Sequence, residues 1–318
     1  MTNLDDFKRL QHEATALDLI ALEPLWRHTS FKVGGPAGLF GRAKDLKHLI
    51  SILNFANSKG LPIFLLGSGS NVLFPDEGYP GLVLKLVKGE FEELVISGER
   101  ENKNQTTDDG GIEINVGAGV TLGKLLKTTT ENSLGGLEDL IGIPGTLGGA
   151  IMMNAGAGTQ TIGERVTSIL ILNTQTLKSE RILRKELEFS YRNMKTKIPS
   201  PIILSATLNL DFRKEREKLE RRIKERLRER KERLPQEPSA GSFFKNPPGN
   251  FAGKLIEECG FKGFIKGGAM VSLKHANVIV NFKDALAKDI LELSDMIEKG
   301  VRERFGISLE REVRVVRP

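Results

Sequence analysis

Hydrophobic and polar positions repeat along this chain with both helical and strand periods, so the sequence predicts a mixture of the two elements. Residues 44–60 predict an amphipathic helix, because one stripe of it carries Leu46, Leu49, Ile50, Leu53 and Ala56. The apolar runs at 62–67 and 81–86 predict strands, with the turn GSGSN between them at 67–71. We interpret residues 1–90 as a first α+β block.

A second block, residues 91–212, contains more strands. Apolar runs predict these strands at 93–97, 112–120, 166–176 and 202–212, with a polar loop at 98–111 and a helix at 121–133. A glycine-dense stretch, GGLEDLIGIPGTLGGAIMMNAGAG, lies between this helix and the last two strands, at 135–158. We expect it to act as a second glycine loop beside the sheet.

A third block, residues 213–318, opens with a segment of different character. Residues 213–233 are almost entirely charged and predict a long helix that ends before Pro235 and Pro238. The remainder predicts a loop at 239–250, a short helix ending at Gly260, a strand at 276–282, a helix at 284–305 and a strand at 309–316. The predicted class is therefore α+β, with domains at 1–90, 91–212 and 213–318.

The net charge suggests a nucleic-acid partner, but the distribution of charge along the chain argues against one. The chain of 318 residues has a formal charge of +6 and a pI near 9.3, which is typical of nucleic-acid-binding proteins. Residues 213–233 hold 12 Lys/Arg and 6 Asp/Glu, so this one helix accounts for the whole excess. Charges of both signs at three- and four-residue spacing pair along a helix face. We interpret it as a solvated helix that lends positive potential to nearby anionic ligands, and we expect no nucleic-acid partner.

Composition excludes several other classes. No apolar run is long enough for a transmembrane helix, and the first residues lack the pattern of a signal peptide. The single cysteine, Cys259, excludes an internal disulfide framework and fits a reducing compartment. The four histidines are scattered without metal-ligand spacing, so no metal site is expected. We expect a cytoplasmic protein without membrane insertion and without an obligate protein partner.

The first candidate for chemistry is GSGSNVLF at 67–74, directly after a strand. A turn of small residues exposes successive backbone N–H groups that can bind a phosphate or diphosphate. It lacks the lysine of a Walker A loop, and Val72 stands where the dinucleotide-binding fingerprint requires glycine. The alternative is a flexible β-turn.

The second glycine stretch suggests close backbone approach to a flat or charged group, or tight packing of loop on sheet. Two such loops beside strands favour one large nucleotide cofactor between them.

Three other segments carry polar side chains suited to a small anionic substrate. In FSYRNM at 189–194, an extended backbone would place Ser190 and Arg192 on one face, and Arg192 can present a fork to a carboxylate. In SAGSFFKNP at 239–247, two phenylalanines anchor the loop and direct the hydroxyl of Ser242, although no GxSxG elbow supports a hydrolase. In the last strand, Glu312 and Arg314 share a face and form a polar wall. The alternatives are a surface arginine, a buried serine and a solvated strand face.

Taken in order, these motifs resemble the MurB family, UDP-N-acetylenolpyruvoylglucosamine reductase. The resemblance extends from HTSFKVGGPA at 28–37 to REVRVV at 311–316 and includes GLEDLIGIPGTLGGAIMMNAGA, PSAGSFFKNP, AGKLIEECGFKG and KHANVIVN. It implies an FAD-binding fold of the vanillyl-alcohol-oxidase type in two subdomains, with a C-terminal substrate domain. It also implies that NADPH reduces FAD, which then reduces UDP-N-acetylglucosamine enolpyruvate to UDP-N-acetylmuramate, a peptidoglycan precursor.

The resemblance further implies roles for individual residues. It makes Ser242 the proton donor to C2 of the substrate, with Arg192 and Glu312 beside the substrate carboxylate. It implies that the FAD diphosphate and ring are bound by two loops, comprising Gly67, Ser68, Gly69, Ser70, Asn71 and Val72 in the first and Gly145, Thr146, Gly148, Gly149 and Ala150 in the second. The implied substrate contacts are Asn246, Lys262, His275 and Arg314.

Two departures from the family pattern stand out. The interval between Arg192 and Ser242 is short, which resembles the subgroup lacking an inserted loop whose tyrosine covers the diphosphate. Gly158 also stands where many relatives have an aromatic residue. An oxygen-using flavoprotein oxidase of the same fold and a basic nucleic-acid-binding protein are the alternatives. No histidine stands in a covalent flavin attachment motif, and the FKNP and REVRVV segments match the reductase better.

Overall fold

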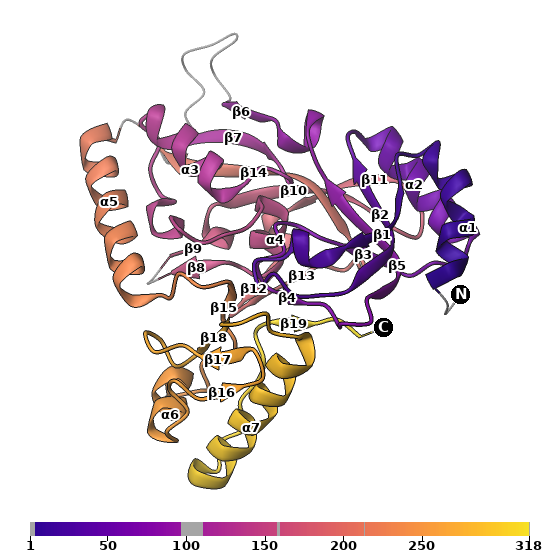
Figure 1. Cartoon of the computed structure of the whole chain (residues 1–318). Coiled ribbons are helices and arrows are strands. Elements are labelled where there is room, and N and C mark those ends of the chain that lie inside the picture. The colour runs from indigo at the N-terminus through magenta and orange to yellow at the C-terminus, as the bar shows by residue number, and fades with distance from the viewer. Residues whose placement is uncertain (1–3, 97–110, 158–159, 213, 318) are drawn as a thin grey trace.

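The computed structural model describes residues 4–96, 111–157, 160–212 and 214–317. It has the α+β architecture that the sequence predicts, with three main sheets (Figure 1). The predicted polar loop at 98–111 lies almost wholly outside the described residues, and so does Gly158. Within the described residues, no helix is long and apolar enough to cross a membrane, and no cluster of three or more potential metal ligands occurs.

The first sheet has the strand order β1-β2-β5-β3, in which β2, β5 and β3 are parallel. Its strands are β1 (Ile20–Pro24), β2 (Pro36–Ala43), β3 (Ile63–Leu65) and β5 (Tyr79–Leu86). The helices α1 (Leu4–Thr15) and α2 (Leu46–Ser58) accompany it, and the Asp45 side chain caps α2 by accepting from the backbone N–H of His48. Because β3 leads directly into residues 67–71, the first glycine loop lies at the carboxyl end of the parallel strands, where such sheets bind ligands.

The second sheet is antiparallel, in the order β11-β10-β14-β7-β6. Its strands are β6 (Leu94–Ile96), β7 (Gly111–Gly117), β10 (Val166–Leu172), β11 (Ser179–Leu183) and β14 (Ile202–Asp211). The helix α3 (Leu122–Glu131) begins at the capping residue Thr121. Within the glycine-dense stretch, the expectation of a loop throughout is wrong, because Leu147–Met152 form the short helix α4. Leu147 and Ile151 of α4 are buried in the core, which stabilises a helix that Gly148 and Gly149 disfavour locally.

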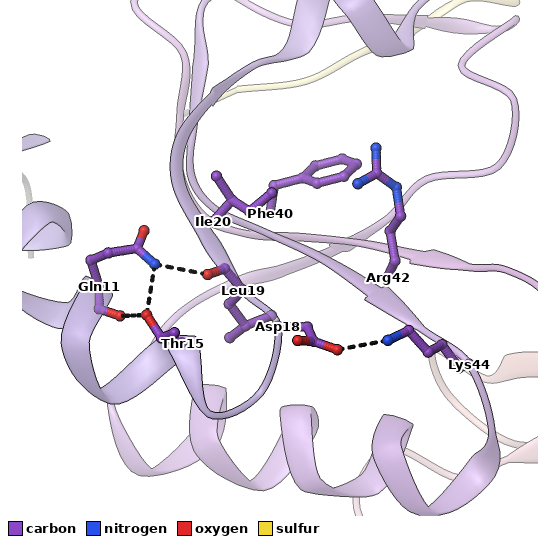
Figure 2. Close-up of a pocket in the computed structure, with 8 residues that line it drawn as sticks. All are labelled: Gln11, Thr15, Asp18, Leu19, Ile20, Phe40, Arg42 and Lys44. Carbon is purple, nitrogen blue, oxygen red and sulfur yellow. Dashed lines mark hydrogen bonds and ion pairs between the residues drawn. The ribbon is translucent and has the colours of Figure 1, made fainter.

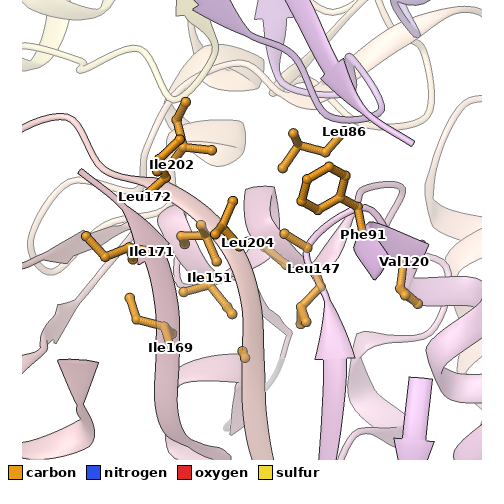
Figure 3. Packing of buried hydrophobic residues seen from close by; sticks show 14 of the residues in the cluster. Leu86, Phe91, Val120, Leu147, Ile151, Ile169, Ile171, Leu172, Ile202 and Leu204 are labelled. Carbon is orange, nitrogen blue, oxygen red and sulfur yellow. The ribbon is translucent and has the colours of Figure 1, made fainter. Parts of the chain in front are cut away.

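One hydrophobic core joins the first two blocks. Leu86 from the first block belongs to the same cluster as Phe91, Val120, Leu147 and Leu204 from the second (Figure 3). The C-terminal block has a separate core, which also includes Phe31, Val33 and Leu73 from the first block. Contacts across these boundaries therefore hold the three blocks in one arrangement. The division at 90 and 212 remains a sequence-based prediction.

The C-terminal block contains the sheet β15-β18-β17-β16, formed by β15 (Ser239–Ser242), β16 (Ile265–Lys266), β17 (Ala269–Val271) and β18 (Val278–Asn281). The helices α6 (Ala252–Glu258) and α7 (Ala287–Phe305) pack on each other beside it. The segment 239–242 pairs with β18 and is a strand, where the sequence predicted a loop. The chain then returns to the first block, where β19 (Arg314–Val315) pairs with β4 (Val72–Leu73).

The charged helix α5 (Arg216–Arg233) contacts α3 and the 3₁₀ helix η3 (Glu138–Leu140) of the second block. It runs along one side of that block, and its C-terminal end points toward the C-terminal domain (Figure 1). Two short hairpins complete this region, β8 (Gly156–Ala157) with β9 (Gln160–Thr161), and β12 (Glu188–Ser190) with β13 (Asn193–Lys195). Other 3₁₀ turns are η1 (Leu25–His28), η2 (Gly89–Glu92), η4 (Ile162–Glu164) and η5 (Arg184–Glu186).

Candidate active site

The two glycine loops lie against each other. The Ser70 hydroxyl donates a hydrogen bond of 2.7 Å to the carbonyl oxygen of Pro144, just before Gly145. A Cβ placed on Gly67 would lie 2.7 Å from the Thr146 hydroxyl, so the residue at 67 must be small. Segments far apart in the sequence thus form one continuous surface of backbone and hydroxyl groups.

The first loop presents a row of free backbone donors. No described residue accepts a hydrogen bond from the N–H groups of Gly67, Ser68, Gly69, Ser70 or Asn71. Gly69 has φ +69°, and a Cβ there would lie 2.0 Å from the carbonyl oxygen of His28, so only glycine fits. Successive free N–H groups in such a turn bind phosphate oxygens. The side chain of Val72 is buried, so only its main chain is available to a ligand.

The second loop divides into open and packed positions. A Cβ on Gly145 or Gly149 would meet a single hydroxyl at 3.9 or 3.6 Å, so the backbone there borders open space. Thr146 precedes α4, but its hydroxyl does not cap that helix and remains available. In contrast, Gly148 packs on Ala118 and donates its N–H to that residue's carbonyl oxygen, and Ala150 is buried. Together, the free donors and open glycine backbone fit the diphosphate and flat ring of a flavin nucleotide.

Arg192 lies at the turn of the β12–β13 hairpin. The prediction of an extended segment is wrong here, because the chain reverses at Tyr191 and Arg192, and Arg192 has φ +55°. This left-handed conformation is uncommon for a residue with a side chain and is found at functional sites. The guanidinium donates from Nη1 to the carbonyl oxygen of Gly156 at 3.5 Å. The turn therefore determines where the guanidinium points.

Arg192 forms an ion pair with Glu312, in which Nε lies 2.5 Å from Oε1. Both side chains are largely buried, at 24% and 13% exposed. Nε is nevertheless a buried nitrogen without a hydrogen-bond partner of regular geometry, so the pairing is a charge contact. A ligand carboxylate or enolate could therefore share this guanidinium with Glu312.

Burial raises the pKa of Glu312 above its usual value, although the charges of Arg192 and Lys245 and the Arg192 contact act in the opposite direction. The backbone of Glu312 is fixed at both ends. Its N–H donates to the carbonyl oxygen of Phe243 at 2.8 Å, and its carbonyl oxygen accepts from the Asn71 side chain at 3.1 Å. Glu312 thus adjoins both the Ser242–Phe243 segment and the first glycine loop.

Ser242 occupies the last position of β15, directly before the buried pair Phe243 and Phe244. The two aromatic rings fix the backbone, as the sequence predicted, since their centroids lie 5.1 Å apart in the C-terminal core. Among the described residues, none forms a hydrogen bond with the Ser242 hydroxyl. A half-buried hydroxyl without a protein partner is able to donate its proton to a ligand.

Three of the four predicted substrate contacts gather around α6. Asn246 Oδ1 accepts from the N–H of Ala252 at 3.0 Å, at the start of that helix. His275 Cε1 would lie 3.3 Å from a Cβ on Gly253, in the same turn. Lys262 follows the helix and pairs with Glu257 at 2.9 Å. Burial lowers the pKa of His275, and the charges of Arg233 and Lys262 lower it further, which favours the neutral imidazole.

Arg314 lies apart from this group. The predicted continuous strand 309–316 is wrong, because the chain bends at Val313 and only Arg314–Val315 form β19. The Arg314 guanidinium lies over the ring of Phe64, 4.6 Å from its centroid, while Glu312 faces Arg192. The two side chains therefore do not form the shared wall that strand alternation suggested. Arg314 borders the first glycine loop, since its N–H donates to the carbonyl oxygen of Asn71.

One contact that the sequence did not predict joins the Arg192 hairpin to the C-terminal domain. The Tyr191 hydroxyl accepts from the N–H of Asn246 at 3.3 Å, although the Tyr191 side chain is 54% exposed. The pairing of Lys245 with Glu310 at 2.5 Å also orients the adjoining loop. No local sequence pattern predicts either contact, because the two partners of each lie far apart in the chain.

A shallow pocket of about 440 Å³ lies elsewhere, near the N-terminus (Figure 2). It is lined by α1, the following turn and strands β1 and β2, and within its lining the Arg42 guanidinium lies 5.0 Å from the centroid of the Phe40 ring. The ion pair between Lys44 and Asp18 crosses its edge. None of its lining residues is a predicted site residue, and it has no chemistry matching the Arg192–Glu312 site.

Comparison with known proteins agrees with this geometry. Residues 233–316 match the family model for the UDP-N-acetylenolpyruvoylglucosamine reductase C-terminal domain, and residues 38–175 match that for an FAD binding domain. The chain is 40% identical over 294 residues to UDP-N-acetylenolpyruvoylglucosamine reductase 2 of Symbiobacterium thermophilum, covering 92% of this chain and 90% of the relative. It is also 40% identical to the reductase of Desulforamulus reducens, covering 92% of both chains. The crystal structure of the Thermus caldophilus enzyme superposes with a TM-score of 0.74 at 34% identity, covering 94% of this chain and 98% of that one.

Proposed function

This chain belongs to the UDP-N-acetylenolpyruvoylglucosamine reductase family, and on that premise we propose that it is an FAD-dependent oxidoreductase that uses NADPH to reduce UDP-N-acetylglucosamine enolpyruvate to UDP-N-acetylmuramate. The observation that carries the proposal is the convergence of Arg192, Ser242 and Glu312 beside two loops with free backbone donors. Bound FAD would accept a hydride from NADPH and deliver it to C3 of the enolpyruvyl group.

The two glycine loops would hold the cofactor. The free N–H groups of residues 67–71 would bind its diphosphate, since backbone donors need no side-chain charge to bind phosphate. The open backbone at Gly145 and Gly149 would lie against the flat ring, and the Thr146 hydroxyl would hydrogen-bond to it. Arg314, beside the Asn71 carbonyl group, borders the same loop and fits an anionic part of either ligand.

Arg192 would bind the substrate carboxylate and stabilise negative charge that develops on it as C3 accepts hydride. The ion pair with Glu312 orients the guanidinium before substrate arrives, which reduces the reorganisation needed in the transition state. Because burial raises the pKa of Glu312, this residue can be protonated and donate a hydrogen bond to the same enolate-like group.

Ser242 would complete the reaction by donating its hydroxyl proton to C2. Its free hydroxyl and its fixed backbone support that role, because a general acid must be positioned before it transfers a proton. The C–H bonds formed at C3 and C2 account for one hydride and one proton, and solvent restores the serine proton. The Asn246, Lys262 and His275 group would bind the nucleotide-sugar part.

The biological setting follows from the product. UDP-N-acetylmuramate is a precursor of peptidoglycan, so we propose that this enzyme supports cell-wall synthesis and, through it, cell shape and division. Since both substrates are water-soluble nucleotides, we propose a cytoplasmic location and a role without a nucleic-acid or obligate protein partner.

The absorption spectrum tests the function directly. Purified protein should be yellow, anaerobic NADPH should bleach it, and the enolpyruvyl UDP-sugar should restore the colour with formation of UDP-N-acetylmuramate. A folded protein that binds no flavin would contradict the proposal. Rapid restoration of colour by air without the UDP-sugar would indicate an oxidase instead.

A further inference from the structure

The inward-facing stripe of α5 carries five regularly spaced residues, Leu219, Arg222, Arg226, Arg230 and Arg233, at intervals of three or four positions. Such spacing places all five on one side of a helix. Leu219 is buried in the interface with the second block. The four arginines that follow it lie along the same side of the helix, where Arg226 and Arg230 are half-buried and Arg222 and Arg233 are exposed.

The first two arginines have a protein anion. Arg222 donates from Nη2 to both oxygens of Asp139 at 3.1 Å, and Arg226 donates from Nε to Oδ1 at 3.1 Å. The Asp139 side chain is only 2% exposed. These contacts attach the N-terminal and central turns of α5 to η3.

Arg230, one turn further on, has no such partner. Its stem lies on Gly142, where a Cβ would be 3.0 Å from Cδ and 3.1 Å from Nε. Its Nε is buried without a hydrogen-bond partner, and no described carboxylate pairs with it. Burial lowers the pKa of this guanidinium. Because a half-buried guanidinium whose buried Nε has no partner is costly, the arrangement favours an anionic ligand at this point.

Arg233, exposed in the last turn of α5, lies near enough to the substrate-contact group for its charge to lower the pKa of His275. Its charge acts on His275 together with that of Lys262, and Glu257 provides the opposing charge near them. No described carboxylate pairs with Arg233 either. Two cationic side chains, Arg233 and Lys262, thus lie near the imidazole of His275, with the carboxylate of Glu257 among them.

The last turn of α5 is held in place by the C-terminal domain. Leu234 packs on Met270, Val278 and Val280, and Lys274 Nζ donates to the carbonyl oxygen of Lys231 at 3.3 Å. On the opposite side, Arg230 rests on the loop that leads to Gly145. The last turns of α5 therefore connect the loop before Gly145, which Arg230 contacts at Gly142, with the His275 group near Arg233.

We propose that Arg230 and Arg233 bind the diphosphate of the UDP-sugar substrate. The inference rests on the proposed function and extends it, by assigning the diphosphate contact to the last turns of the charged helix. Two guanidinium forks match a diphosphate in charge and in hydrogen-bonding geometry.

Equilibrium binding provides the test. Calorimetry of the flavin-loaded protein with UDP-N-acetylglucosamine, and separately with uridine, compares ligands with and without the diphosphate. Arg230→Gln and Arg233→Gln should each weaken binding of the UDP-sugar by roughly tenfold, the scale of one charge-assisted contact, while leaving uridine affinity unchanged. Arg230→Lys should recover part of the affinity, because charge is kept and the fork is lost. Arg221→Gln, on the exposed face of the same helix, is the control and should bind normally.

Two results would overturn the proposal. One is UDP-sugar affinity within twofold of wild type in the folded double variant Arg230→Gln/Arg233→Gln. The other is loss of flavin from that variant with normal UDP-sugar binding by the flavin-loaded fraction, which would assign the arginines to the cofactor. Turnover by wild-type protein distinguishes a failure of the diphosphate assignment from a failure of the proposed function. If wild type reduces the enolpyruvyl UDP-sugar and the variant binds normally, only the diphosphate assignment fails, whereas a wild type without turnover refutes the function itself.

Discussion

Arg192 Nε and Glu312 Oε1 lie 2.5 Å apart, although one residue belongs to a hairpin of the second block and the other to the C-terminal segment. The pair closes the site between these two parts of the molecule. Asn71 binds the Glu312 carbonyl group and Phe243 binds its N–H, so a cofactor loop and the Ser242 strand meet at the same residue. Replacement of any of these groups is expected to affect the reaction in a distinguishable way.

Replacement of Ser242 by alanine should separate the two half-reactions. The variant should bind flavin and be reduced by NADPH at the wild-type rate, because no described residue forms a hydrogen bond with the serine hydroxyl. Reoxidation by the enolpyruvyl UDP-sugar should slow by about a hundredfold or more, the usual contribution of a general acid. Stopped-flow absorbance under anaerobic conditions measures both steps. Ser239→Ala, in the same strand, is the control, and equal slowing of both half-reactions would contradict the proton-donor role.

Replacement of Glu312 by glutamine should change a pH profile. Since burial raises the pKa of Glu312, its carboxyl group ionises at a higher pH than a free glutamate. If the neutral acid assists the reaction, substrate-dependent flavin reoxidation should fall as pH rises through that raised pKa. Glutamine cannot ionise, so the variant should lack this decline and be slower at low pH.

The same raised pKa has a consequence for stability. A carboxyl group that is easier to protonate in the folded state contributes stability fully below its unfolded pKa and loses it as pH rises through the folded value. Denaturant unfolding of wild type and Glu312→Gln at several pH values measures this slope. The slope should be smaller in the variant, and an identical slope would show that Glu312 titrates normally.

Replacement of Gly69 by alanine should remove flavin binding. The added Cβ would lie 2.0 Å from the carbonyl oxygen of His28 in a left-handed conformation, so the first glycine loop must move. We expect unfolding free energy to fall by about 3 kcal/mol and flavin content to drop sharply. Gly249→Ala is a matched control, because Gly249 has φ +73° with open space around it. The control should cost only about 1 kcal/mol and keep its flavin.

Replacement of Asp139 by asparagine should loosen α5. This buried carboxylate binds both Arg222 and Arg226, and the neutral side chain would leave Arg222 without an anion and Arg226 with only Glu229. We expect a loss of about 1–3 kcal/mol in thermal or denaturant unfolding, with reduced UDP-sugar affinity because Arg230 and Arg233 depend on the same helix. Glu220→Gln removes only the exposed pair with Arg216 and should change neither measurement.

Local pattern was sufficient to predict α2, α3, α5 and α7 within a few residues, because their apolar stripes, caps and proline stops lie within the elements themselves. The position of the glycine loops was also predictable, since only glycine permits the backbone at Gly69 to approach His28 so closely. Sequence order of these motifs was enough to indicate the family before any contact was known.

Tertiary structure decided what local pattern could not. The left-handed turn at Arg192, the bend at Val313 and the separation of Arg314 from Glu312 all depend on packing between blocks, which strand alternation does not describe. The sequence located the net positive charge in one helix, but only the fold shows that Asp139 pairs with two of its arginines and leaves Arg230 without an anion. The physical reason is that periodicity reports which side of an element is buried, whereas the partner on that side comes from a distant part of the chain.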